Sequence, residues 1–335
     1  MNMNAQRDQP LVQIAARNPT ELQIRLSGAA EQYHPQAQFE AIEAALEDAL
    51  ARFPHVQEIE LEGSSSPELS CRLQREGLAI LADKRHLCSA AMLQQRARFW
   101  LRGGSSNGFP LTYRLTDGKR HPLRPPKPTG VVYSRYISWL DCTFSLRRVQ
   151  IDADLGNFHR WMNQPRVAQF WQENGDLDKH RQYLQGIEAD PHIIALMGCF
   201  ADRPCAYLEV YWAKEDRIAP FYDAQDYDRG WHGLVGEESF LGRHYVAAWI
   251  PSFMHYMFLD DARTQRIVGE PRHDNSRIIA NLERNGFARL KHFDFPHKRA
   301  LLVMLLRERF FGDRLLSPQW DSVAAPVRQS SAAEL

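Results

Sequence analysis

A strand, a glycine-containing loop and a helix follow one another at residues 231–245, an order that can build an anion site. The loop holds Gly236 and Gly242, and the helix is predicted to begin near Arg243. The first N–H groups of a helix lack partners within it and lie at the positive end of its dipole, so such a junction binds phosphate groups. Arg243 adds a charged donor that a pyrophosphate would accept. The alternative is a glycine turn followed by a solvated arginine.

A second candidate segment covers residues 270–287. Asn275 is predicted to begin a helix, and Gly286 and Phe287 follow it. Gly286 is well placed to be the left-handed residue that closes a helix, and Phe287 then returns the chain to a strand.

The elements that position these segments form a mixed α/β pattern. Hydrophobic periodicity predicts strands over 144–150, 192–200, 205–213, 231–238, 266–271, 290–295 and 300–306. It predicts helices over 152–164, 176–190, 242–259 and 275–287. Sheets of this kind bind ligands where a parallel pair of strands separates.

A small α+β region precedes this pattern. The segment 38–53 reads as a helix with one apolar face, and short strand-like runs occur at 11–16, 21–28 and 57–63. Four prolines within 121–130 predict an extended linker. We therefore expect an N-terminal region over 1–130, a main domain over 131–316 and a flexible tail over 317–335, with residues 1–10 also frayed.

Composition excludes several classes of protein. The 335 residues suggest two domains, and 41 basic residues balance 41 acidic ones, which argues against a generally basic nucleic-acid-binding protein. Five cysteines, an odd number without a CxxC pair, favour reduced thiols in the cytosol. The N-terminus lacks the apolar run of a signal peptide, and no stretch approaches the roughly 18 apolar residues of a spanning helix. The sequence therefore predicts a soluble, cytoplasmic protein with neither nucleic acid nor membrane as partner.

Together, the loop and helix at 238–245 and the pairing of Asn275 with Gly286 and Phe287 resemble the GNAT superfamily of N-acyltransferases. The family's pyrophosphate loop usually reads Gln/Arg-x-x-Gly-x-Gly/Ala. Here the loop keeps Gly242 but lacks the basic first position and the second glycine.

Three longer runs make the resemblance more specific: EVYWAKEDRIAPFYDAQDYDRGWHGLVGEESFLGR, EPRHDNSRIIANLERNGF and FPHKRALLVMLLRERFF. They resemble the GNAT branch that acylates hydroxylated diamines or amino acids in hydroxamate siderophore synthesis, which includes the aerobactin-type N-hydroxylysine acetyltransferases and the mycobactin-type lysine N-acyltransferases. The similarity covers about residues 133–313.

The resemblance implies an α/β GNAT fold with an N-terminal α+β extension, and acetyl-CoA or another acyl-CoA as co-substrate. Transfer would be direct, without an acyl-enzyme, since no cysteine lies in the motifs. The implied cofactor-binding residues are Leu234, Val235 and Gly236, by backbone pairing with pantetheine, and Gly242, Arg243, His244, Tyr245 and Asn275.

His232 and Asp274 are the catalytic residues that the resemblance implies. In this branch a histidine after an Arg-Gly pair and an aspartate before the motif asparagine are the usual acid-base candidates, and both positions match. Attack of an amine or hydroxylamine on a thioester releases a proton, which an imidazole titrating near pH 6.5 can accept. Asp274 would hold the ring in one tautomer. The alternatives are a packed strand histidine and a helix N-cap.

The position of the usual general acid departs from the family pattern. Many GNAT enzymes carry a tyrosine seven residues after the motif asparagine, where this chain has Leu282. Either the thiolate leaves with solvent help or another group, such as Tyr245 or His244, protonates it. The sequence leaves these alternatives open.

The acceptor is expected near an acidic segment. Residues 215–238 carry a net charge of −5, and residues 265–315 carry +5, so a cationic amine and an anionic CoA would each meet a field of opposite sign. Two ordinary solvated faces are the alternative. The expected substrate-binding residues are Glu209, Tyr211, Trp212, Tyr222, Asp228, Arg229 and Glu238.

The cluster of His292, Asp294 and His297 suggests a metal by composition. On a strand, however, His292 and His297 would lie on opposite faces, and the family pattern also argues against a metal, so none is predicted.

The sequence therefore predicts an acyl-CoA-dependent N-acyltransferase. Its acceptor would be a small N-hydroxylated amine such as N-hydroxylysine, N-hydroxyornithine or an N-hydroxy diamine, and other siderophore-pathway enzymes are candidate partners. The alternatives are a GNAT acetyltransferase for another amine, such as an aminoglycoside, and a non-catalytic acyl-CoA-binding module.

Overall fold

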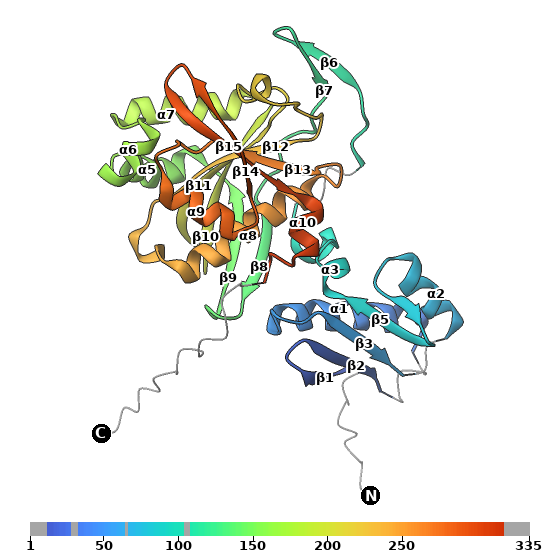
Figure 1. Cartoon of the computed structure of the whole chain (residues 1–335). Coiled ribbons are helices and arrows are strands. Elements are labelled where there is room, and N and C mark those ends of the chain that lie inside the picture. Colours follow the sequence, from blue (N-terminus) through green and yellow to red (C-terminus); the bar gives the residue numbers. More distant parts are fainter. Residues whose placement is uncertain (1–11, 28–32, 64–65, 104–107, 318–335) are drawn as a thin grey trace, which may run out of the picture.

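The chain builds two main sheets, as the computed structural model in Figure 1 shows. The structure describes residues 12–27, 33–63, 66–103 and 108–317. The predicted frayed start and nearly all of the predicted tail lie outside these residues. A five-stranded sheet forms from the N-terminal region and an eight-stranded sheet from the chain after Gly130.

The smaller sheet has the order β1-β2-β3-β5-β4. The predicted helix over 38–53 is present as α1, whose apolar side, including Phe39, Ile42 and Leu46, is buried. The elements of this region are β1 (Val12–Asn18), β2 (Glu21–Leu26), α1 (Pro35–Arg52), β3 (Glu58–Glu62), α2 (Pro67–Arg75), β4 (Ile80–Ala82), β5 (Arg85–Ser89), α3 (Ala90–Leu93) and α4 (Ala97–Trp100).

A two-stranded hairpin of β6 (Tyr113–Thr116) and β7 (Lys119–Pro122) projects from the molecule (Figure 1). The predicted proline-rich linker therefore begins inside this hairpin, and residues 123–129 run on without regular structure. Arg124 forms two hydrogen bonds with Glu215 (2.5 and 2.6 Å), which join this connection to the loop after β11.

The larger sheet has the order β14-β15-β13-β12-β11-β10-β9-β8. Among the described strands of this sheet, β12 and β13 form the one parallel pair, and their pairing is limited to Arg229 with Ile267 and Gly230 with Val268. The strands are β8 (Val131–Ile137), β9 (Cys142–Arg148), β10 (Ile193–Phe200), β11 (Arg203–Trp212), β12 (Arg229–Val235), β13 (Arg266–Gly269), β14 (Ala288–Phe295) and β15 (Lys298–Leu306).

Helices cover both faces of the larger sheet because its strands carry buried side chains on both sides. Leu155, Phe158 and Leu184 pack with Tyr207 and Leu234 on one face. The helices on this side are α5 (Ile151–Met162), α6 (Pro165–Trp171) and α7 (Leu177–Ala189). The opposite face packs on α8 (Arg243–Asp260), α9 (Ser276–Arg284) and α10 (Arg307–Gly312).

Three elements around this sheet are additional to the predicted pattern: β8, α6 and α10. The two helices have seven and six residues, which is too short for a 3.6-residue period to emerge from the sequence. In α6 the signal is its start, since Pro165 occupies the first helical turn, where proline is favoured.

The two regions share one hydrophobic core. Trp100, Tyr133 and Phe310 belong to the same cluster, and their rings surround His255 on α8. The buried His255 accepts from the Tyr133 hydroxyl at Nδ1 (3.0 Å) and donates from Nε2 to the Gln94 carbonyl (2.6 Å). Burial lowers the pKa of His255 to about 3, so the ring is neutral. A neutral ring therefore joins the two regions.

In the part of the chain that the structure describes, every helix is too short or too polar to traverse a lipid bilayer. All five cysteines have free thiols, as their odd number and spacing predicted.

Candidate active site

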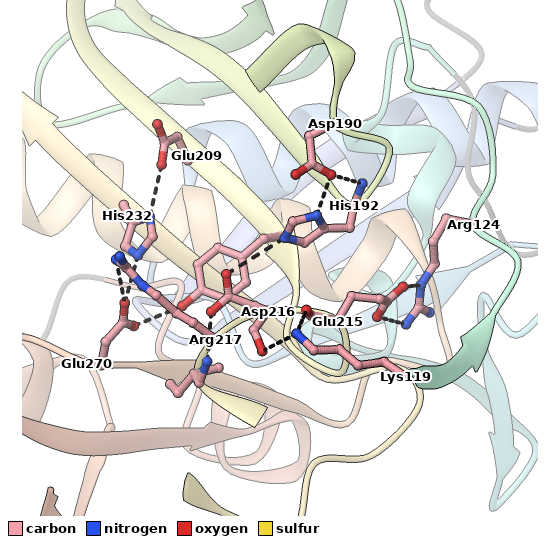
Figure 2. A network of polar contacts seen from close by, with 12 residues as sticks. Lys119, Arg124, Asp190, His192, Glu209, Glu215, Asp216, Arg217, His232 and Glu270 are labelled. Atoms are coloured by element: carbon pink, nitrogen blue, oxygen red, sulfur yellow. Dashed lines mark hydrogen bonds and ion pairs between the residues drawn. The ribbon is translucent and has the colours of Figure 1, made fainter. Parts of the chain in front are cut away.

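A histidine held between two carboxylates lies at the centre of the larger sheet (Figure 2). His232 Nδ1 lies 2.9 Å from Glu209 Oε2, and His232 Nε2 lies 2.7 Å from Glu270 Oε1. Both glutamates are buried, whereas the His232 side chain is 23% exposed. The ring is thus the part of this group that a small molecule can reach.

Three tyrosines complete the hydrogen bonding of the two carboxylates. Tyr183 and Tyr207 donate to Glu209 Oε1 (2.7 and 2.8 Å), and Tyr211 donates to Glu270 Oε2 (2.8 Å). Buried carboxylates are tolerated when their oxygens are paired in this way, because the partners replace the lost water. The tyrosines therefore allow two ionised groups to lie beside one ring.

The geometry fixes the charge of the His232 ring. An ionised carboxylate can only accept, and a neutral imidazole has a single N–H, so two carboxylates on both nitrogens require an imidazolium. Burial opposes this charge, but the negative charge of Glu270 and the hydrogen bonds with Glu209 and Glu270 outweigh it and raise the pKa of His232 to about 10. Although burial acts to raise the pKa of Glu270, the charge and hydrogen bond of His232 lower it to about 2.

This finding changes the role that the sequence predicted for His232. A ring that already carries both protons cannot accept another, so the resting site presents His232 as a proton donor. The sequence predicted a neutral imidazole with its usual pKa. The two glutamates instead stabilise the imidazolium.

Strand pairing places the three groups together. Glu209 on β11 lies directly opposite His232 on β12, on the same face of the sheet. Glu270 follows the last residue of β13, just beyond the short parallel pairing with β12. Gly230 is required here, because a side-chain Cβ at this position would lie 2.1 Å from the Tyr211 ring.

The parallel pair separates beside the predicted pantetheine-binding residues. The pairing of β12 with β13 ends at Gly230, so Leu234 and Val235 lie where the two strands have diverged. Arg166 of α6 donates to the carbonyls of Val235 and Gly236 (2.8 and 2.7 Å). The Gly236 carbonyl also accepts from the Gln164 side chain (3.0 Å), which uses both of its lone pairs, so Arg166 and Gln164 fix the end of β12 in place.

The loop before α8 has the geometry predicted for an anion site. Gly242 is the N-cap of α8, with φ +129°, and a Cβ there would meet no atom within 4 Å. Residues 243 and 244 are exposed, and Tyr245 packs on the rings of Phe200 and Phe240. The first turn of α8 therefore opens to solvent over an aromatic base.

The helix predicted from Asn275 is present. The Asn275 side chain accepts from the Ile278 N–H (3.3 Å) at the start of α9. Gly286 has φ +88° after the last turn, and Phe287 N donates back to the Leu282 carbonyl (3.0 Å). The side chain of Leu282 is buried in the core, so α9 carries no proton donor at that position.

The structure does not bring Asp274 to the His232 ring. Asp274 instead pairs with Arg272 (3.1 and 2.6 Å) and remains half exposed. The contacts with the ring that were expected of Asp274 are made by Glu209 and Glu270.

The expected substrate-binding residues divide into two groups. Glu209 and Tyr211 contact the central group, as described above. The other residues lie away from the ring. Trp212 stacks on Arg229, which is fully buried and pairs with Asp260. Asp228 is buried and contacts Arg266 and Tyr222, whereas Glu238 is mostly exposed near Arg166. Trp212, Tyr222, Asp228 and Arg229 thus hold the fold together around the site.

The predicted acidic field is largely neutralised by ion pairs. Glu215 pairs with Arg124, Asp228 with Arg266, and Glu237 with Arg160. With the longer contacts of Asp226 to Lys214 and of Glu238 to Arg166 (both 3.7 Å), five of the seven carboxylates hold basic partners, so the net charge of −5 overstates the field that a cationic acceptor would meet.

Within the described ranges, no group of three or more His, Cys, Asp or Glu side chains is arranged to hold a metal ion. In the cluster of His292, Asp294 and His297, the His297 ring stacks on Phe295, with ring centroids 5.5 Å apart.

Sequence reasoning missed Glu270, Tyr183, Tyr207 and Arg166. Glu270 had a signal, since it lies at the carboxyl end of the strand predicted over 266–271, and polar groups at that end of the strands often form sites in sheets of this kind. The two tyrosines had none, because only the folded sheet and α7 bring them to Glu209.

Comparison with known proteins gives the family and the fold that this chain resembles. Residues 150–295 match the family model described as an acetyltransferase (GNAT) domain. A solved structure of an uncharacterized protein from Bacillus halodurans is 28% identical, with a TM-score of 0.53, over 56% of this chain and 94% of that protein. The predicted α/β acyltransferase fold is confirmed.

Two curated relatives are closer in sequence. The chain is 51% identical over 195 residues to the N(5)-hydroxyornithine:cis-anhydromevalonyl coenzyme A-N(5)-transacylase SIDF of Beauveria bassiana, a match covering 57% of this chain and 43% of that protein. It is 46% identical over 190 residues to the N(6)-hydroxylysine O-acetyltransferase of Escherichia coli, covering 57% and 60%. The chain thus spans about half the length of these relatives.

Proposed function

We propose that this chain, whose residues 150–295 match the GNAT acetyltransferase domain model, transfers an acyl group from acyl-CoA to a hydroxylated amine of siderophore biosynthesis. The observation that carries the proposal is the His232 ring, half enclosed between Glu209 and Glu270 beside the point where β12 and β13 separate. The printed names of both relatives, which specify hydroxyornithine and hydroxylysine, support the choice of acceptor.

The acyl-CoA would enter from the α8 end of this site. Its pyrophosphate would meet the exposed first turn of α8 after Gly242, and its pantetheine would run along Leu234, Val235 and Gly236. Acetyl-CoA is the simplest donor for this arrangement. No metal ion takes part in the proposed reaction.

Proton transfer would pass through His232 and Glu270 as a unit. The attacking nitrogen loses a proton as the N–C bond forms, and His232 Nε2 can take it once the ring has given up its own proton, because the buried Glu270 carboxylate then stabilises the returning imidazolium. The C–S bond breaks, and the sulfur receives a proton from the His232 imidazolium. One proton enters the pair and one leaves, so the pair returns to its initial state. In this scheme the imidazolium supplies the proton that Leu282 cannot.

An assay of CoA release against a panel of amines tests the proposal. We expect turnover with N-hydroxylysine, N-hydroxyornithine or an N-hydroxy diamine. Turnover with aminoglycosides alone would favour the alternative function, an acetyltransferase for another amine. Tight CoA binding without turnover of any amine would favour a binding module and overturn the proposal.

A genomic observation bears on the pathway. Genes for an amine hydroxylase and a siderophore synthetase beside the gene for this chain would support the biosynthetic role and identify candidate partner enzymes.

A further inference from the structure

Arg217 presents a half-exposed guanidinium next to the central group (Figure 2). It lies in the loop after β11, and its NH2 is 3.9 Å from Glu270 Oε1. Its guanidinium also lies over the Phe295 ring, 5.4 Å from the centroid. None of the described side chains accepts a hydrogen bond from Arg217, so its donors are available to a ligand.

Lys298 is a second cation close to the same Glu270 oxygen. Its Nζ donates to the Glu270 backbone carbonyl (2.8 Å) and lies 3.8 Å from Glu270 Oε1. The lysine is mostly buried, whereas Arg217 is 50% exposed, so Arg217 is the cation that faces incoming molecules.

Charges of both signs surround Glu270. Three cations, His232, Arg217 and Lys298, converge on it, and Glu209 is the further carboxylate on the His232 ring. Asp216, next to Arg217 in sequence, lies 3.7 Å from His192, and its negative charge also acts on Lys298. Three positive and three negative charges therefore balance, and Arg217 is the half-exposed cation among them, which suits a ligand with an anionic end.

Strand register separates this cation from the CoA end of the site. Along β12, Val235 is opposite Ala206, His232 is opposite Glu209, and Arg229 is opposite Trp212. The loop before α8 adjoins the Val235 end, where Phe240 stacks on Phe200. Arg217 follows Trp212 at the opposite end, so an anion bound there belongs to the acceptor and not to CoA.

We infer that Arg217, with Lys298 behind it, binds the carboxylate of a hydroxylated amino acid, so that the acceptor is a hydroxylated amino acid and not a hydroxylated diamine. This inference rests on the proposed function. An arginine binds a carboxylate through two parallel, charge-assisted hydrogen bonds. A diamine would instead place an ammonium group against a cation.

Two substrates that differ in one group test the inference. N6-hydroxylysine and N-hydroxycadaverine share chain length and nucleophile, and only the first has a carboxylate. We expect wild-type kcat/KM to favour N6-hydroxylysine by about 10- to 100-fold, the range for a hydrogen bond to a charged group. Arg217→Gln should remove most of this preference, and Arg217→Glu should reverse it, with the KM for acetyl-CoA unchanged.

Arg289→Gln is the matched control, since Arg289 is an exposed arginine on β14 that pairs with Glu283. It should keep the wild-type preference. Equal kcat/KM for both substrates in the wild type and in Arg217→Gln would overturn the inference while leaving the proposed function intact. A raised KM for acetyl-CoA in Arg217→Gln would assign the arginine to CoA and also overturn it.

If no hydroxylated amine is turned over, the proposed function fails, and calorimetric binding then decides the inference. Tighter binding of N6-hydroxylysine than of N-hydroxycadaverine, lost in Arg217→Gln, would support a carboxylate site. Equal binding of the two would overturn it.

Discussion

Glu270→Gln tests the protonation state that the structure assigns to His232. Glutamine has nearly the shape of glutamate, so the Tyr211 hydroxyl keeps an acceptor while the negative charge is lost. Glu270 supplies the largest effect that raises the pKa of His232. Its loss should therefore let the ring give up its proton at a lower pH.

The size of the shift follows from the geometry. Nε2 and Oε1 are 2.7 Å apart. Because each charge is spread over its group, the centres of charge lie roughly 4 Å apart, where the attraction is about 4 kcal/mol at an effective dielectric constant of about 20. That corresponds to about 3 pKa units, the upper end of the 1 to 3 units usual for one neighbouring charge. The pKa of His232, about 10 in the wild type, should fall to between about 7 and 9.

The pH dependence of kcat, followed by CoA release, reports this change. In the wild type we expect kcat to be flat from about pH 7 to 9 and to fall near pH 10, where the imidazolium loses its proton. In Glu270→Gln, kcat should be lower by about 10²-fold or more, and the descending limb should move to between about pH 7 and 9.

Glu283→Gln carries the same substitution at an exposed residue of α9 and should retain the wild-type profile. A wild-type kcat that rises through pH 7 to a plateau would identify a neutral His232 acting as base and would refute the reasoning. A descending limb that stays in place in Glu270→Gln would refute it as well.

Three further predictions concern the same region. His232→Ala should lower kcat by about 10²-fold or more while the Kd for CoA, measured by calorimetry, stays nearly unchanged; equal rates would remove His232 from catalysis. Gly242→Ala forces an L-residue into φ +129°, at a cost of about 1–3 kcal/mol. The KM for acetyl-CoA should therefore rise by about 10-fold with little change in kcat. An unchanged KM would exclude this turn from the CoA site. Because the folded-state pKa of His232 is raised from 6.5 to about 10, its contribution to stability is complete below about pH 6.5 and is lost as pH rises towards 10. The free energy of unfolding in urea should therefore fall more steeply over this range in the wild type than in His232→Gln, and parallel curves would contradict the assigned pKa.

Local rules were sufficient for the elements that flank the site. Asn275 caps α9 and Gly286 closes it because short-range hydrogen bonds and backbone conformation decide both ends. The central strands β10 and β11 were recognisable as short apolar runs separated by a turn, and almost all of their residues are buried. The short α6 and α10 lack enough turns to show a period, and the pairing partner of β8 is a matter of tertiary structure.

The site itself was only half predictable. His232 and the residues opposite it on β11 could be found from motif and register, since neighbouring strands bring them together. Glu270 is 38 residues away, and its contact depends on two paired positions between β12 and β13. Charge counting failed for the acidic segment because it cannot show which carboxylates are already paired with arginines.

The position of His255 has a consequence for thermal unfolding of the chain. Gln94 and Trp100 lie in the N-terminal region, whereas Tyr133 and Phe310 lie in the larger unit, and all four surround this one ring. Disordering either region would uncover aromatic surface of the other and leave the buried imidazole without partners, which is costly in both halves. Heating should therefore give one calorimetric transition, in which the sheets on the two sides of Gly130 unfold together.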